Sequence, residues 1–123
     1  GERARVLLAR ALAVEAPMLF ADEPIASLDP LHQLTTLRLL RARATAGAGI
    51  LVVLHDLGLA ARFCDRLVLV ADGRLLADGP PARVLTDERV AQAYGVEIAR
   101  ATHRGEEFLI PWREARGPKD GAA

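Results

Sequence analysis

Two adjacent carboxylates at the end of a short apolar run constrain this chain more than any other feature of its sequence. The run Met18-Leu-Phe-Ala21 leads directly into Asp22 and Glu23, and Pro24 follows. A short apolar run with a proline on each side is typical of a buried strand in a parallel sheet. Open α/β sheets bind their ligands at the carboxyl ends of such strands. The pattern therefore predicts an α/β fold with Asp22 and Glu23 at a ligand-binding edge.

The same pair of carboxylates suggests a particular chemistry. Neighbouring carboxylates repel each other, so a cation or a polarised water molecule is their natural partner. In nucleotide hydrolysis an aspartate at this position holds Mg²⁺ through its water shell, and a neighbouring carboxylate polarises the attacking water. A simpler interpretation is that Asp22 and Glu23 begin a loop and cap the helix that follows.

Segments on either side of the pair favour the first interpretation. Upstream, Gly1-Glu-Arg-Ala-Arg5 opens an apolar, arginine-bearing helical pattern that continues to Glu15. Downstream, Ser27-Leu-Asp29 is followed by a second apolar strand pattern, Ile50–Leu54, which ends in His55. A strand-end imidazole beside the carboxylates of a neighbouring strand is in a position to contact a γ-phosphate and to orient water. The alternative is that His55 is a core residue.

In this order, Gly-Glu-Arg-x-Arg, Asp-Glu-Pro, Ser-Leu-Asp and strand-His-Asp resemble the C-terminal half of the nucleotide-binding domain of an ABC-transporter ATP-binding subunit. The resemblance covers about the first 80 residues. Gly1 and Glu2 match the tail of the family's signature loop. In that family the signature loop faces the γ-phosphate of a nucleotide bound by the opposite subunit of a dimer.

The other motifs match residue by residue. Asp22 matches the Walker B aspartate, which holds Mg²⁺ through water, and Glu23 matches the catalytic glutamate. Asp29 ends the match to the D-loop, where the resemblance implies a contact across the dimer in addition to helix capping. His55 matches the switch histidine of the H-loop.

The resemblance implies a partial P-loop NTPase domain with a mostly parallel sheet flanked by helices. It implies ATP and Mg²⁺ as cofactors, a head-to-tail dimer with a second ATP-binding subunit, and transmembrane permease subunits as partners. The implied location is cytoplasmic, peripheral on the inner face of the cell membrane. The variant sequences of residues 22–30, 55–66 and 94–97 resemble the importer branch for iron-siderophore, haem and cobalamin substrates.

One departure from the family pattern concerns the phosphate-binding loop. The 123 residues contain no Gly-x-x-x-x-Gly-Lys-Ser/Thr motif, whose backbone amides cradle the phosphates of ATP. The sequence therefore resembles a fragment of a longer subunit, and we expect the chain alone to be inactive. Two other function classes stay open: an ABC ATPase of chromosome maintenance or translation, and a non-catalytic, truncated dimerisation module.

Charge and composition argue against two kinds of partner, nucleic acid and the membrane interior. Sixteen basic and sixteen acidic residues balance, so the chain has no basic footprint for nucleic acid. It has no apolar run long enough to span a bilayer, so we expect no direct membrane insertion. Cys64, the single cysteine, cannot form an internal disulfide and suits a reducing compartment.

The remaining sequence predicts alternating elements. Asp29 and Pro30 predict the N-cap and first residue of a helix that runs to about Ala46. The positions expected to face inward are Leu31, Leu34, Leu37, Leu40 and Ala44. His32 and His103 are expected to be exposed residues without a function.

Beyond the second strand, we expect a helix over residues 57–63 and a hairpin over 65–79 that turns at Asp72-Gly73. Two short helices split near Thr86 follow over residues 80–94, and then a terminal hairpin over 96–112. The sequence thus divides into residues 1–80 (the nucleotide-binding domain half), 81–115 (a C-terminal extension) and 116–123 (a disordered tail).

Overall fold

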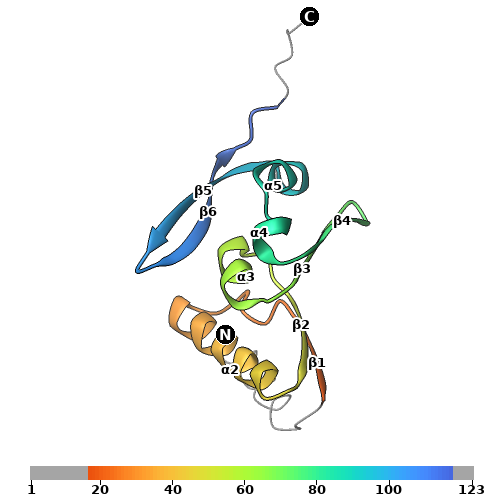
Figure 1. The fold of residues 1–123 in the computed structure, drawn as a ribbon, viewed down its shortest axis with the longest axis vertical. Coiled ribbons are helices and arrows are strands. Elements are labelled where there is room, and N and C mark those ends of the chain that lie inside the picture. The colour runs from red at the N-terminus through yellow and green to blue at the C-terminus, as the bar shows by residue number, and fades with distance from the viewer. Residues whose placement is uncertain (1–16, 118–123) are drawn as a thin grey trace, which may run out of the picture. The chain divides into compact units, whose positions relative to one another are not determined.

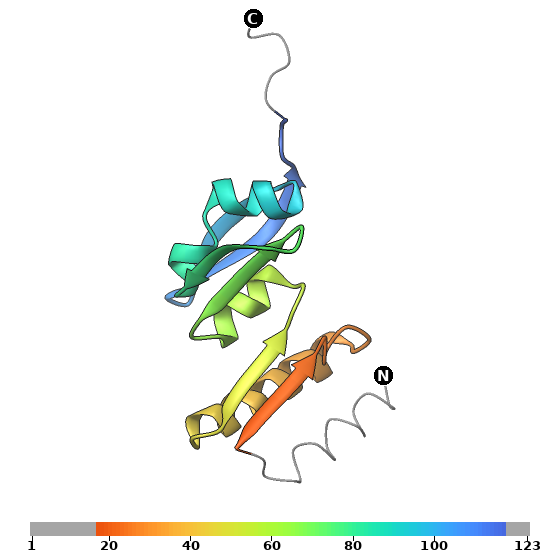
Figure 2. The ribbon, with the colours of Figure 1, turned by 90° about the vertical axis from the view of Figure 1, so that its right-hand side faces the viewer.

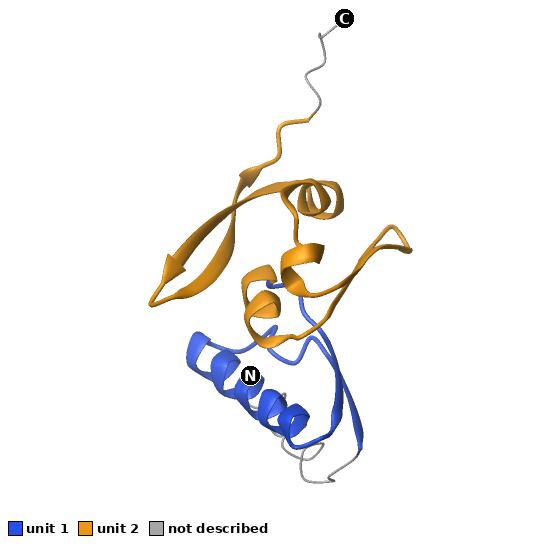
Figure 3. Ribbon diagram, in the orientation of Figure 1, with its two compact units in different colours: residues 1–56 blue, residues 57–123 orange. Residues whose placement is uncertain are grey.

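The computed structural model describes residues 17–117 of the 123-residue chain. Gly1 and Glu2, the helix expected before Pro17, and most of the expected tail lie outside the described residues. The chain forms two compact units, residues 1–56 and 57–123 (Figure 3). These units divide at a different place from the three sequence segments, because residues before and after position 80 share one core in the second unit.

The first unit is built around a pair of parallel strands. Strand β1 (Met18–Asp22) pairs with β2 (Gly49–Val53), and the helix α2 (Pro30–Thr45) connects them. Parallel strands need such a crossover, because their ends lie too far apart for a tight turn. Figure 2 shows the two strands side by side, with α2 against one face. The expected α/β fold and both expected strands are confirmed.

Helix α2 begins and ends where the sequence predicts. Asp29 is its N-cap, Pro30 is its first residue and Ala46 is its C-cap. Leu37 and Leu40 are buried as expected, but Leu31 is 69% exposed and the prediction for it is wrong. At about 100° per residue, Leu31 lies on the opposite side of the helix from Leu40. The predicted inward positions are mostly spaced three residues apart, but one helical turn takes about 3.6 residues. Positions spaced in this way move around the helix, and the first of them no longer lies on the face that packs on the sheet.

The expectation that β1 is buried holds for only one of its faces. Ala21 is buried, whereas Met18, Phe20 and the neighbouring Leu51 on β2 are exposed, Phe20 to 62%. Side chains alternate across a strand, and α2 covers only the face that carries Ala21. Within the described residues, Met18, Phe20 and Leu51 form an uncovered apolar surface, here called the open sheet face.

Over residues 57–117, which the structure describes, the second unit contains two hairpins and three short helices, labelled in Figure 1. In chain order the elements are α3 (Leu57–Phe63), β3 (Leu67–Ala71), β4 (Arg74–Gly79), α4 (Pro81–Val84), α5 (Asp87–Tyr94), β5 (Val96–His103) and β6 (Glu106–Glu114). The predicted elements are confirmed to within about two residues at their ends. Both strand pairs are antiparallel.

Turn residues define both hairpins. Asp72 and Gly73 between β3 and β4 have φ angles of 51° and 70°. Arg104 and Gly105 between β5 and β6 have φ angles of 50° and 81°. Positive φ at both central residues is the type I′ geometry, whose twist matches that of the flanking strands. The turn predicted at Asp72-Gly73 is thus confirmed.

A continuous core holds the second unit together. Its buried residues come from both hairpins and all three helices or their ends: Leu57, Leu69, Val84, Leu85, Val90 and Leu109. Val84 and Val90 are fully buried. None of the helices described in residues 17–117 is long and apolar enough to cross a membrane.

An ion pair joins the two ends of the β3–β4 hairpin. Arg66 donates two hydrogen bonds of 2.6 Å to the two carboxylate oxygens of Asp78. These hydrogen bonds, with a smaller contribution from the charge of the guanidinium, lower the pKa of the Asp78 carboxyl below its ordinary value of 3.8.

Candidate functional site

The parallel strand pair brings the ends of β1 and β2 to one edge of the first unit. Asp22 and Val53 are the last residues in register, and the Glu23 amide donates to the Val53 carbonyl over 3.0 Å. The next side chains along both strands therefore emerge close together. His55 Nε2 lies 2.5 Å from Glu23 Oε1. The expectation that these two strands are neighbours is confirmed.

The contact between Glu23 and His55 joins two of the predicted site residues. An ionised carboxylate only accepts hydrogen bonds, so Nε2 of His55 is the donor and carries the hydrogen. The two side chains are exposed, Glu23 to 44% and His55 to 68%, which leaves both accessible to water. In this chain His55 is therefore not a core residue. A carboxylate held by an imidazole and open to solvent can accept a proton from a bound water.

The backbone of Glu23 adopts an unusual conformation. Its φ angle is 50°, in the left-handed region that costs a side-chain-bearing residue roughly 1–2 kcal/mol. Hydrogen bonds hold it on both sides: its amide donates to Val53, and its carbonyl accepts from the Ala26 amide over 3.3 Å. The strained turn thus sits where the chain leaves β1 and where the carboxylate meets His55.

The loop that follows Glu23 is anchored at two points. Ile25 and Leu28 are buried, and the Leu28 amide donates to the Ile25 carbonyl over 3.1 Å. The side-chain amide of Gln33 on α2 also donates to the Ile25 carbonyl, over 3.3 Å. These contacts give the segment between Glu23 and Asp29 a defined path.

Asp29 caps α2, as predicted, and its cap includes a residue that the sequence interpretation missed. Asp29 Oδ1 accepts the His32 amide at 2.9 Å and lies 2.7 Å from His32 Nδ1. The prediction that His32 has no role beyond exposure is therefore wrong in part. The signal was available, because His32 occupies the third helical position, where side chains fold back onto the N-cap.

Asp22 provides the oxygen chemistry that a magnesium ion prefers. Its side chain is exposed at the end of β1, directly before Glu23. Mg²⁺ keeps several waters and is bound by one or two carboxylates together with substrate phosphates, so a single exposed carboxylate fits it. Among residues 17–117, no group of three or more histidine, cysteine, aspartate or glutamate side chains forms a ready metal site.

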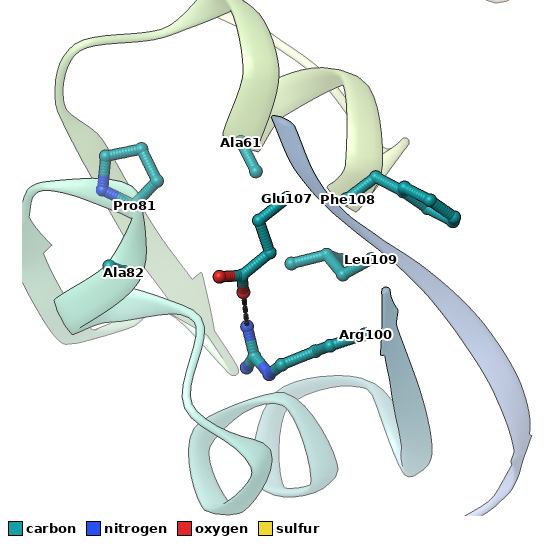
Figure 4. A pocket seen from close by; sticks show the side chains of 7 residues that line it. All are labelled: Ala61, Pro81, Ala82, Arg100, Glu107, Phe108 and Leu109. Carbon is teal, nitrogen blue, oxygen red and sulfur yellow. Dashed lines mark ion pairs between the residues drawn. The ribbon is translucent and has the colours of Figure 1, made fainter. Parts of the chain in front are cut away.

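A separate pocket in the second unit contains none of the predicted site residues (Figure 4). It has a volume of about 140 Å³ and is lined by Ala61, Pro81, Ala82, Arg100, Glu107, Phe108 and Leu109. Arg100 lies 3.6 Å from Glu107 and 3.4 Å from Asp87, and it donates to the Leu85 carbonyl. The guanidinium is thus used to join the terminal hairpin to the loop between α4 and α5.

Comparisons with known proteins agree on one family of relatives. No family model matches the chain. The hemin import ATP-binding protein HmuV of Rhodococcus jostii is 48% identical over 118 residues, which are 94% of this chain and 40% of that protein. The cobalamin import ATP-binding protein BtuD of Halobacterium salinarum is 50% identical over 103 residues, which are 83% of this chain and 26% of that protein.

Solved structures give the same result for the fold. An ABC transporter in an inward-facing conformation matches 90% of this chain and 46% of its own, with a TM-score of 0.78 and 21% identity. An ATP-binding subunit of an ABC transporter matches 75% of this chain and 37% of its own, with a TM-score of 0.60 and 33% identity. The resemblance expected from the motifs is therefore confirmed: this chain, which spans 40% of the length of its Rhodococcus relative, is homologous to part of the ATP-binding subunits of ABC transporters.

Proposed function

We propose that this chain is the part of an ABC importer's ATP-binding subunit that carries the hydrolytic carboxylate, coupling ATP hydrolysis to the uptake of an iron-siderophore, haem or cobalamin-type substrate. The observation that carries the proposal is the 2.5 Å contact between Glu23 and His55 at the carboxyl edge of β1 and β2. The names of the relatives, hemin and cobalamin import proteins, support the choice of transported substrate.

Each site residue has a distinct task in this proposal. Glu23 accepts a proton from the water that attacks the γ-phosphate, and His55 orients Glu23 and contacts that phosphate. Asp22 holds Mg²⁺ through water, and the ion neutralises charge on the phosphates when bound. Gly1 and Glu2 contact the nucleotide of the opposite subunit, and Asp29 makes a contact across the dimer.

The partners follow from the same proposal. A second ATP-binding subunit completes each site in a head-to-tail dimer, and permease subunits carry the substrate across the membrane. The subunit is cytoplasmic and lies on the inner face of the cell membrane through its permease. Residues 1–123 contain no P-loop sequence, so on their own they do not hold ATP well enough to hydrolyse it.

A chimera tests the proposal directly. In it, residues 1–123 replace the matching 118-residue segment of the Rhodococcus relative, so that the relative supplies the rest of the subunit. We expect the chimera to hydrolyse ATP and Glu23→Gln to lower turnover on the order of 10²-fold or more while ATP still binds. Asp22→Asn should instead weaken Mg²⁺-dependent nucleotide binding.

Two results would contradict the proposal. One is normal turnover by the Glu23→Gln chimera, which would remove Glu23 as the base. The other is measurable turnover by the 123-residue chain alone, above its own Glu23→Gln control.

A further inference from the structure

One carboxylate oxygen of Asp29 receives two contacts from the same residue. The backbone amide of His32 lies 2.9 Å from Oδ1, and the imidazole Nδ1 lies 2.7 Å from that same atom. An ordinary helix cap uses the backbone contact alone. The imidazole is therefore an addition to the cap.

The second contact limits how the Asp29 side chain can turn. Ionised carboxylate oxygens only accept, so Nδ1 of His32 carries the hydrogen in this contact. Two donors that converge on one oxygen fix which oxygen caps the helix and hence the direction of the whole carboxylate group. The His32 side chain is 31% exposed and the Asp29 side chain is 59% exposed, so the contact lies where solvent reaches it.

The loop contacts connect this cap to the carboxylate at position 23. The Gln33 amide donates to the Asp29 carbonyl over 2.9 Å, and the Gln33 side chain donates to the Ile25 carbonyl. The Glu23 carbonyl accepts from Ala26 one turn earlier. Glu23 and Asp29 thus belong to one continuous hydrogen-bonded segment, residues 23–33.

We propose that His32 is a positioning residue for Asp29: it holds the carboxylate in the direction from which Asp29 contacts the opposite subunit. This inference rests on the proposed function, because the contact across the dimer belongs to it. Loss of the imidazole leaves the backbone cap in place, so the helix persists while turnover falls. Misplaced groups in assembled sites lower rates strongly, and we expect a loss of roughly tenfold.

The test compares His32→Leu with His32→Asn in the same chimera. Leucine and asparagine have the same branching, but only the asparagine amide places an N–H donor where Nδ1 lies. His32→Leu should lower turnover roughly tenfold at saturating ATP, and His32→Asn should recover most of it. His103→Leu, an exposed histidine in the second unit, is the matched control and should leave turnover unchanged.

A double-mutant cycle with Asp29→Ala separates positioning from a general effect. If His32 acts through Asp29, adding His32→Leu to the Asp29→Ala chimera should cause no further loss. Turnover of His32→Leu equal to that of His103→Leu, or additive losses in the cycle, would overturn the inference. Equal losses in His32→Leu and His32→Asn would do the same.

These results differ from a failure of the proposed function. If the unmutated chimera shows no Glu23-dependent hydrolysis, the proposed function and this inference both fall. If the unmutated chimera hydrolyses ATP and the His32 variants have the same turnover, only this inference is wrong. Melting temperatures of the His32 and His103 variants should stay within a few degrees of the unmutated chimera, because the Asp29 side chain still caps α2 in them. Asp29→Ala removes this cap and should melt at a lower temperature.

Discussion

The two units of the chain differ in where their chemistry and their packing lie. The first unit carries Asp22, Glu23, Asp29 and His55, and none of its residues that the structure describes covers the open sheet face of β1 and β2. The second unit carries none of the predicted site residues, yet it buries two valines completely and continues its core through all of its elements.

This difference shows two ways of fixing a structure. In the first unit, the hydrogen bonds of Glu23 to Val53 and His55, together with two buried loop residues, Ile25 and Leu28, hold the site geometry. In the second unit, burial of apolar side chains in one continuous core holds the elements, in addition to the hydrogen bonds of the two hairpins. Site geometry and core stability should therefore respond to different substitutions.

The largest effect is expected from a cavity in the second unit. Leu85 is 2% exposed, and Leu85→Ala in the 123-residue chain should lower the free energy of unfolding by about 2–5 kcal/mol. Leu75→Ala, at an exposed position on β4, is the control and should change it by less than about 0.5 kcal/mol. Urea denaturation measures both. Equal losses would mean that the second unit has no distinct core.

The next effect concerns His55 and falls on activity. His55→Ala in the chimera should lower turnover on the order of 10²-fold, because the Glu23 carboxylate loses the group that orients it. The melting temperature should hardly change, since the His55 side chain is 68% exposed. The opposite pattern, a large loss of stability with normal turnover, would return His55 to a packing role.

A smaller effect is expected from acid. Because the Asp78 pKa is lowered in the folded chain, the ion pair stabilises the fold above the ordinary pKa of 3.8, and this stabilisation is lost as the pH falls through the lowered value. An NMR titration should show Asp78 titrating below 3.8, and Arg66→Gln should return it toward that value. An Asp78 that titrates unchanged in the Arg66→Gln chain would contradict the assigned cause.

The smallest effect on stability is expected at the open sheet face. Phe20→Thr should change the free energy of unfolding of the 123-residue chain by less than about 0.5 kcal/mol, because Phe20 is already 62% exposed. It should also reduce self-association in sedimentation experiments, since exposed apolar surface promotes it. A loss as large as that of Leu85→Ala would show that the face is covered in solution.

Features with a local signal were predictable from the sequence. Asp29 and Pro30 mark the start of α2, and Asp72-Gly73 marks a turn, because each depends on a few adjacent residues. The site edge was predictable for a similar reason: strands that end in carboxylates and in a histidine bring those residues together once they pair in parallel.

Features that depend on contacts between elements were not predictable. The exposure of Phe20 depends on which face α2 covers, and an apolar residue in a strand carries no sign of its face. The left-handed conformation of Glu23 opposes the ordinary preference of its residue type, so no propensity indicates it.

That left-handed conformation has a consequence for engineering and for natural drift. Glycine adopts a positive φ without steric cost and asparagine does so more readily than glutamate, so both residues relieve the strain at position 23. A library of variants selected only for thermal stability should therefore enrich Glu23→Gly and Glu23→Asn. The enriched variants would lack the carboxylate. At position 23, selection for stability and selection for turnover therefore favour different residues.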